Sequence, residues 1–203
     1  MSTVLEIAVF SVEAAISALK AGAHRIEFCE NPQEGGTTPS FGSLQTLRSF
    51  TTQPVFPIIR PRGGDFLYSS IEFEVMKSDL LTIKELGYKG AVIGLLNADG
   101  SIDTKRTKEL VDLAGPSMQI SFHRAFDRAK DPMSALEAII QSGCKRILTS
   151  GQVPNAVDAL PLLKTLQQTA SNRIIIMPGS GVRAANVRMI VDQTGVSEIH
   201  SSA

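Results

Sequence analysis

Tryptophan is absent from the chain, other aromatic residues are few, and only two of the 203 residues are cysteine. Two cysteines cannot make a disulfide framework, so we expect a reducing compartment, the cytoplasm. Lys and Arg together number 20 and so do Asp and Glu, which gives a net charge of zero at pH 7. That balance offers no broad electrostatic surface for nucleic acid or for an anionic membrane.

Long apolar runs are missing as well. None approaches the ~18 residues needed to cross a bilayer, and the start, Met1-Ser2-Thr3, lacks the basic and apolar regions of a secretory signal. Hydrophobic residues still make up 43% of the chain, which fits a soluble globular protein and excludes a collagen, a coiled coil or a disordered tail. We therefore expect a folded cytoplasmic protein without nucleic-acid or membrane partners.

The chain does contain a repeat, in which short apolar stretches alternate with longer amphipathic ones. The expected strands are residues 4–10, 25–30, 55–60, 91–96, 118–122, 146–149, 174–177 and 196–200, and the helical patterns include 12–21, 72–86, 105–113, 135–141, 156–167 and 186–192. Strands that alternate with helices predict a parallel sheet covered by helices. Eight such units predict one α/β domain, residues 1–203, folded as a closed (β/α)8 TIM-type barrel. An open doubly wound sheet is the alternative, although no Gly-rich dinucleotide fingerprint follows the first strand.

Successive strand residues face opposite sides of a sheet, so the apolar residues of each strand predict which side faces the helices. The remaining side chains, predicted to face the barrel axis, are Glu6, Ala8, Phe10, Glu27, Cys29, Ile58, Arg60, Arg62, Gln119, Ser121, His123, Glu198, His200 and Ser202. Barrel interiors are usually filled by branched apolar residues, and buried charges are costly unless they are paired. Two explanations stay open: an internal ion-pair network, chiefly Glu6 and Glu27 with Arg60, or a polar pocket for a ligand.

Several polar loops follow strands at the C-terminal end of the barrel, where active sites of this fold lie. Arginine side chains there suit forked hydrogen bonds to phosphate or carboxylate, and glycine turns after the seventh strand suit phosphate binding through backbone N–H groups. The residues predicted to contact a small anion are Arg60, Arg62, Asp65, Gly179, Ser180, Gly181 and Ser202. The alternative is that these loops only connect elements and that their arginines pair with neighbouring carboxylates.

Two residues at strand ends are candidates for proton transfer. His123 ends the fifth strand and would act as an acid or base near neutral pH, with Glu27 of the second strand as a second proton-transfer group. The alternative for His123 is a hydrogen-bonded structural residue. The pocket hypothesis therefore predicts an enzyme that acts on a small phosphorylated or carboxylated substrate, and a scaffold that works through protein partners is a third hypothesis.

Metal-binding motifs are poor, because neither CxxC nor HExxH occurs. Cys144 begins its strand and Cys29 ends its own, so a barrel places them at opposite ends. Cys29 by itself would be one thiolate ligand of a soft ion such as Cu(I), completed by a histidine or another chain. The alternative is that Cys29 is a small buried apolar residue.

Eight blocks of the sequence resemble the CutC copper-homeostasis family, and the resemblance covers essentially the whole chain. The blocks are LEI at 5–7, AHRIEFC at 23–29, EGGTTPS at 34–40, IRPRGGDFLY at 59–68, SFHRAFD at 121–127, ILTSG at 147–151, MPGSGV at 177–182 and EIHSSA at 198–203. The resemblance implies a cytoplasmic barrel protein associated with copper handling, with Cu(I) bound at Cys29. Members often have a second cysteine in the first strand, where this chain has Ala8.

The eighth predicted strand ends close to Ala203, so the final helix of a barrel is missing from this chain. We expect Ile199 of that strand, with Leu5 and Ile7 of the first, to be exposed between neighbouring helices. An exposed apolar strip is typical of an interface. Either a further C-terminal segment or a second copy of the chain, in a homodimer, would cover it.

Overall fold

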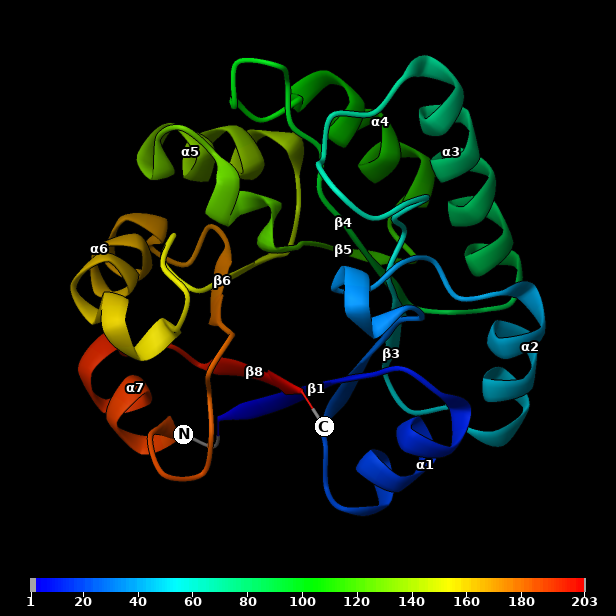
Figure 1. Ribbon diagram of the computed structural model, residues 1–203, viewed down its shortest axis with the longest axis horizontal. Helices are drawn as coiled ribbons and strands as arrows, with labels where there is room; N and C mark the ends of the chain where they lie inside the picture. The colour runs from blue at the N-terminus through cyan, green and yellow to red at the C-terminus, as the bar shows by residue number, and fades with distance from the viewer. Residues whose placement is uncertain (1–2, 203) are drawn as a thin grey trace.

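The computed structural model describes residues 3–202, and it confirms the barrel: a ring of parallel strands lies inside a ring of helices (Figure 1). The strands are β1 (Val4–Val9), β2 (Arg25–Phe28), β3 (Val55–Pro57), β4 (Gly90–Ile93), β5 (Gln119–Phe122), β6 (Arg146–Thr149), β7 (Ile175–Pro178) and β8 (Glu198–Ser202). The α-helices are α1 (Val12–Lys20), α2 (Phe41–Phe50), α3 (Ser70–Glu85), α4 (Thr104–Ala114), α5 (Pro132–Ser142), α6 (Leu160–Ala170) and α7 (Val187–Thr194). Short 3-10 turns η1 (Pro32–Glu34), η2 (Arg124–Arg128) and η3 (Ala156–Ala159) follow β2, β5 and β6.

The ring consists of two four-stranded halves, ordered β3-β2-β1-β8 and β4-β5-β6-β7. On one side a parallel bridge between Ile58 and Val92 joins the halves, and the Ile59 N–H donates to the Val92 carbonyl at 2.8 Å. On the other side β7 lies against β8. All strands run in the same direction, so the loops that follow them meet at one end of the barrel.

Local signals in the sequence start and stop the helices. The Ser40 and Asp131 side chains accept hydrogen bonds from backbone N–H groups in the first turns of α2 and α5, and Pro132 takes the first position of α5. Gly143 ends α5 in the left-handed region at φ 86°, which glycine adopts without steric cost. These caps agree with the predicted helix starts at Ser40 and at Asp131-Pro132.

The strand parity is confirmed. Ile26, Phe28 and Phe122 are fully buried in the main core between strands and helices. A smaller cluster, made of Cys29, Phe56, Ile58, Val92 and Phe10, fills part of the barrel interior.

Several strands are shorter than predicted at their C-terminal ends; for example, β3 ends at Pro57 rather than at residue 60. Beyond Pro57, Ile58 still forms the single bridge with Val92, and Ile58 and Arg60 line a cavity there. Strand β8 instead extends to Ser202.

The expected apolar strip is only partly exposed. Leu5 and Ile7 are half-buried, but the prediction for Ile199 was wrong, because its side chain is 1% exposed and packs into the main core. Residue 203 lies outside the described residues. Among residues 3–202, no helix has the length and apolar character that a membrane crossing requires.

Candidate functional site

A cavity of about 480 Å³ lies where the strands end at their C-terminal side. Its lining residues come from or just after every strand except β4, with Glu27 and Cys29 from β2, His123 following β5 and His200 from β8. A volume of this size suits a small-molecule ligand. We refer to this cavity as the pocket.

Beneath the pocket, the barrel interior holds a buried ion-pair network, but its cations differ from the expected one. Arg25 donates its Nε to Glu6 and an Nη to Glu198, the latter at 2.5 Å. Arg146 donates to the same Glu198 carboxylate at 3.2 Å. The predicted pairing of Glu6 and Glu27 with Arg60 was therefore wrong, because Arg25 of the second strand points inward next to Glu6.

The ring of Phe56 lies close to both arginines of this network, which meet at one oxygen of Glu198. Both guanidinium carbons lie 5.2 Å from the centre of its ring, one from Arg25 and one from Arg146. A side chain at Gly90 would overlap the Phe56 ring, so the glycine gives the ring its space. The contacts with Phe56 hold Arg25 and Arg146 in place next to the carboxylates below the pocket.

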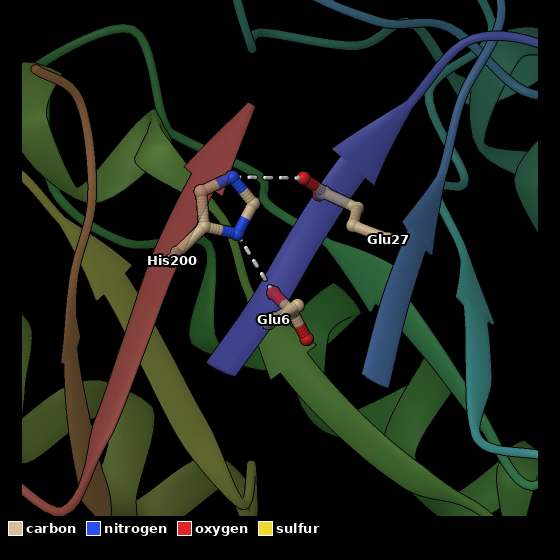
Figure 2. A group of neighbouring side chains, drawn as sticks. All are labelled: Glu6, Glu27 and His200. Atoms are coloured by element: carbon tan, nitrogen blue, oxygen red, sulfur yellow. Dashed lines mark hydrogen bonds and ion pairs between the residues drawn. The ribbon is translucent and has the colours of Figure 1, made fainter. Parts of the chain in front are cut away.

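His200 connects this network to the pocket (Figure 2). Its Nδ1 lies 2.8 Å from a Glu6 carboxylate oxygen, and its Nε2 lies 3.6 Å from an oxygen of Glu27. Burial by itself disfavours charge on all three groups. The hydrogen bond and charge of His200, together with Arg25, nevertheless lower the pKa of Glu6 to about 2. The bond to Glu6 and the charge of Glu27 raise the pKa of His200 despite its burial.

Glu27 behaves differently from Glu6 because no guanidinium among residues 3–202 pairs with it. Burial raises its pKa to about 7, the negative charge of Glu6 adds to the rise, and the positive charges of His200 and Arg25 oppose it. A carboxyl group with a pKa near neutral accepts and releases a proton readily at physiological pH. Glu27 also lines the pocket, so this proton exchange can involve a bound ligand.

Glu6, Glu27 and His200 offer ligand atoms within 4.8 Å of one another, a spacing that also suits a metal ion. Their existing contacts argue for a proton network instead. Glu6 already accepts from Arg25, and Nδ1 of His200 is engaged with Glu6. An ion would have to displace these bonds.

Arg60 lines the pocket and is 4% exposed. Its guanidinium donates to three backbone carbonyls, at 2.5 Å to Glu34, 2.9 Å to Gly36 and 2.8 Å to Gly64. No carboxylate within the described residues forms an ion pair with it. The charge of Arg60 is therefore held in place by the backbone and left without a counter-ion.

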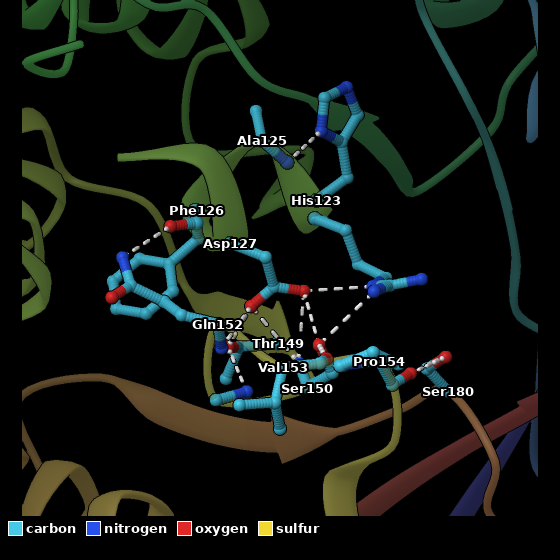
Figure 3. Close-up of polar contacts among 12 residues, drawn as sticks. His123, Ala125, Phe126, Asp127, Thr149, Ser150, Gln152, Val153, Pro154 and Ser180 are labelled. Carbon is cyan, nitrogen blue, oxygen red and sulfur yellow. Dashed lines mark hydrogen bonds and ion pairs between the residues drawn. The ribbon is translucent and has the colours of Figure 1, made fainter. Parts of the chain in front are cut away.

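His123 also lines the pocket and is 4% exposed. Its Nδ1 accepts a hydrogen bond from the Ala125 N–H at 3.1 Å, as Figure 3 shows. Burial and then the nearby charge of Arg60 lower the pKa of His123 to about 3. The ring is thus neutral near pH 7, which does not suit the predicted shuttling of a proton by His123 itself.

Asp127, four residues further on, ties the loop after β5 to the loop after β6 (Figure 3). Its carboxylate accepts bonds from the Ser150 N–H and hydroxyl at 3.0 and 2.9 Å and from Arg124 Nε at 2.8 Å. The Thr149 hydroxyl and the Gln152 N–H donate to the same carboxylate, the latter at 3.2 Å. The pocket wall is therefore rigid at this side.

The other predicted anion contacts divide into two groups. Ser180, Gly181 and Ser202 line the pocket as expected. Arg62 and Asp65 do not line it: Arg62 pairs with Asp65 at 2.9 Å and with Glu72 at 2.5 Å, next to helix α3. These two charges are satisfied by each other and by the helix.

Gly179 is not part of the pocket surface but shapes it. A side chain at this position would overlap Leu148 and press against His200. The glycine therefore lets the loop after β7 approach the residue that connects Glu6 with Glu27.

The two cysteines are buried and unpaired with each other. Burial, and then the negative charges of Glu27 and Glu6, raise the pKa of the Cys29 thiol well above its usual value. Cys144 belongs to the main core, away from the pocket. A single thiol held in its acid form by burial and by the charges of two carboxylates does not fit a tight Cu(I) thiolate site.

Comparisons of the sequence and structure with known proteins show what this chain is similar to. The sequence matches the model of the CutC family over residues 3–203. This chain belongs to the CutC family. It is 52% identical over 201 residues to the "family protein CutC" of Photorhabdus laumondii, covering 99% of this chain and 80% of that protein.

The family extends to animals and to solved structures. The chain is 47% identical to the human "Copper homeostasis protein cutC homolog" over 199 residues, 98% of this chain and 72% of the human protein. A crystal structure of a putative copper homeostasis protein CutC from Streptococcus agalactiae superposes with a TM-score of 0.92 at 32% identity, covering 98% of both chains. The CutC resemblance seen in the sequence blocks is thus confirmed.

Sequence reasoning missed Arg25 and Arg146 as interior residues. Arg25 alternates with Ile26 in the same way as Glu27 does, so strand parity already indicates its inward direction. In β6, Ile147 faces outward in the same pattern. Two extra inward cations would have supplied the partners that Glu6 and Glu198 require.

Proposed function

We propose that this CutC protein is an enzyme that moves a proton to or from a small phosphorylated or carboxylated substrate in the pocket. One observation carries the proposal: Glu27 is a buried carboxyl group, facing a cavity of about 480 Å³, with a pKa raised by burial to about 7. Perturbed carboxyl groups in clefts are typical of catalytic acids and bases.

The network around Glu27 suits this role. His200 lies 3.6 Å from Glu27 and is held from below by Glu6, which Arg25 neutralises. Proton transfer at Glu27 therefore takes place next to His200, which is fixed in position and stabilises the carboxylate form of Glu27. Glu27 is the proposed catalytic group, and Glu6 is a positioning residue that acts through His200.

Positive charge at the pocket favours an anionic substrate. Arg60 has no carboxylate partner among the described residues, and Arg183 at the rim is exposed and donates to its neighbour Val182. Arg124 adds a half-exposed guanidinium that is already paired with Asp127. Arginine binds phosphate and carboxylate through forked hydrogen bonds.

The test is deuterium incorporation. The protein is incubated in D2O with a panel of small phosphorylated and carboxylated compounds, and carbon-bound deuterium is measured by mass spectrometry. We expect at least one compound to exchange with the wild type and to lose that exchange with Glu27→Gln. An unchanged rate in Glu27→Gln would remove Glu27 from the role, and no exchange across the panel would count against the proposal.

Cu(I) binding at Cys29 stays a separate prediction. Its support is the name given to relatives and the position of Cys29 in the pocket wall. Binding requires the thiol to lose a proton against the negative charges of Glu27 and Glu6. Titration of the reduced protein with Cu(I) against a competing chelator tests it, and equal binding by wild type and Cys29→Ala would refute it.

A further inference from the structure

The hydrogen bonding of His123 fixes where its proton lies. Nδ1 accepts from the Ala125 N–H at 3.1 Å, so this nitrogen carries no hydrogen. A neutral imidazole has one N–H, which must then be on Nε2. Because burial and Arg60 keep the ring neutral at pH 7, Nε2–H is a donor that persists over the physiological range.

This donor has no acceptor. Nε2 of His123 is buried without a hydrogen-bond partner within residues 3–202. The ring cannot turn away freely, because it packs directly on Gly94, where any side chain would overlap it. A buried donor without a partner is costly, and such groups mark places where a ligand completes the bonding.

Arg60 lies on the same side of the pocket. The ring of Phe66 contacts both groups, with the Arg60 guanidinium carbon 5.0 Å from its centre and the His123 ring centre also 5.0 Å away. The charge of Arg60 also acts on the His123 ring, so a neutral N–H donor lies in the same part of the pocket as a buried cation that lacks a counter-ion. Both line the cavity that Glu27 also lines.

We propose that His123 and Arg60 hold a substrate oxygen that gains negative charge, and hence that the substrate is a small carbonyl compound deprotonated at the carbon next to its carbonyl. This inference rests on the proposed function of Glu27 as the base. The C–H bond breaks and its proton moves to the Glu27 carboxylate. The electron pair forms a carbon–carbon double bond, and the carbonyl electrons move onto the oxygen, which accepts from His123 Nε2–H and Arg60.

This arrangement gives selectivity for the carbonyl. A neutral imidazole donates to an enolate oxygen without giving up its proton, and a fixed donor needs no reorganisation as the charge develops. An alcohol of the same carbon skeleton that carries a phosphate has no carbonyl and cannot form an enolate. We therefore expect the exchange reaction to select ketones, aldehydes or 2-oxo acids that also carry a phosphate or carboxylate.

The test repeats the deuterium exchange with matched pairs of carbonyl compounds and alcohols. His123→Leu removes the donor, and His123→Gln returns an N–H at a similar reach. We expect exchange only for carbonyl compounds, a loss of about 100- to 1,000-fold in His123→Leu, as for removal of one oxyanion donor, and partial recovery in His123→Gln. His24→Leu is the matched control, because Nδ1 of His24 also accepts a backbone N–H at 3.1 Å but lies exposed, outside the pocket.

The outcomes separate this inference from the function it rests on. If Glu27→Gln abolishes exchange while His123→Leu keeps the wild-type rate, the donor pair is refuted and Glu27 remains the base. Equal exchange of alcohols and carbonyl compounds would also refute the substrate class. If Glu27→Gln and His123→Leu both keep the wild-type exchange rate, both proposals are refuted.

Two further measurements test the donor without relying on exchange rates, and the first reads the ring directly in the folded wild type. Nitrogen NMR of the imidazole rings should show one ring that keeps the Nε2–H form from pH 5 to 8. The signal is assigned to His123 by its absence in His123→Gln. An Nδ1–H form of this ring would overturn the inference. Oxalate, a planar dianion that resembles an enolate, should bind about 10-fold or more weakly to His123→Leu, as expected for loss of a hydrogen bond to a charged acceptor. Equal oxalate affinity would contradict the donor role.

Discussion

Replacing Arg25 with methionine removes the cation that two buried carboxylates share. In the wild type, Arg25 donates to Glu6 and, at 2.5 Å, to Glu198, with its side chain 7% exposed. Breaking a buried ion pair from one side costs about 3–5 kcal/mol. We expect a loss near the low end, about 3 kcal/mol, because Glu6 keeps His200 and Glu198 keeps Arg146. Methionine fills a similar volume, so a cavity contributes little to this value.

The pH dependence provides an independent check. The folded-state pKa of Glu6 is lowered from 4.5 to about 2, because His200 and Arg25 outweigh burial. Its stabilising contribution is therefore present above pH 4.5 and is lost as the pH falls toward 2. At 1.36 kcal/mol per pKa unit, this contribution amounts to about 3 kcal/mol. The loss should be smaller in Arg25→Met, because part of the charge that lowers the pKa of Glu6 is gone.

Urea unfolding between pH 2 and pH 7, followed by circular dichroism, measures both effects. The matched control is Arg173→Met, which breaks the exposed pair with Glu137 and should leave the midpoint close to the wild-type value. An Arg25→Met midpoint equal to that of the control, with the wild-type slope against pH, would refute the assignment of the network as a buried, mutually dependent set.

Three further outcomes are expected. Because the pKa of Glu27 is raised by burial from 4.5 to about 7, its stabilising contribution is present below pH 4.5 and is lost as the pH rises through 7. Glu27→Gln should therefore flatten the fall in the free energy of unfolding between pH 5 and 8, and an unchanged slope would argue against a raised pKa. Gly94→Ala would overlap the His123 ring and should lower stability by about 1–3 kcal/mol, whereas Gly42→Ala, with open space in helix α2, should raise it by about 0.5–1 kcal/mol in thermal unfolding. The two buried thiols, including Cys29 with its raised pKa, should react slowly with an aromatic disulfide at pH 7 and rapidly after unfolding; fast reaction of the native protein would contradict their acid form.

Much of the fold follows from local information. Alternation of apolar stretches at strand and helix periods sets the eight units, and caps such as Ser40 and Asp131 set helix starts. Strand parity also places Glu6, Glu27 and His200 inside the barrel, because an inward or outward direction depends only on neighbours along one strand. The family can also be recognised without the structure, because the CutC blocks are stretches of the sequence itself.

Partners across the barrel depend on distances that no local pattern contains. Arg25 rather than Arg60 neutralises Glu6, since β1 and β2 pair with Glu6 opposite Arg25 in the ladder. Arg60 is instead held by the carbonyls of the loop after β2, and Arg62 turns toward helix α3. Register and loop path decide these pairings.

Periodicity and strand direction along the chain are enough to predict a parallel barrel, most of its inward-facing polar residues and the end at which a pocket forms. Which of those residues are charged, neutral or poised between the two depends on the folded three-dimensional arrangement. Burial and the arrangement of neighbouring charges lower the pKa of Glu6, raise that of Glu27 and keep His123 neutral. These are properties of an environment assembled from β1, β2, β5 and β8, and they exist only when the strands close into a ring.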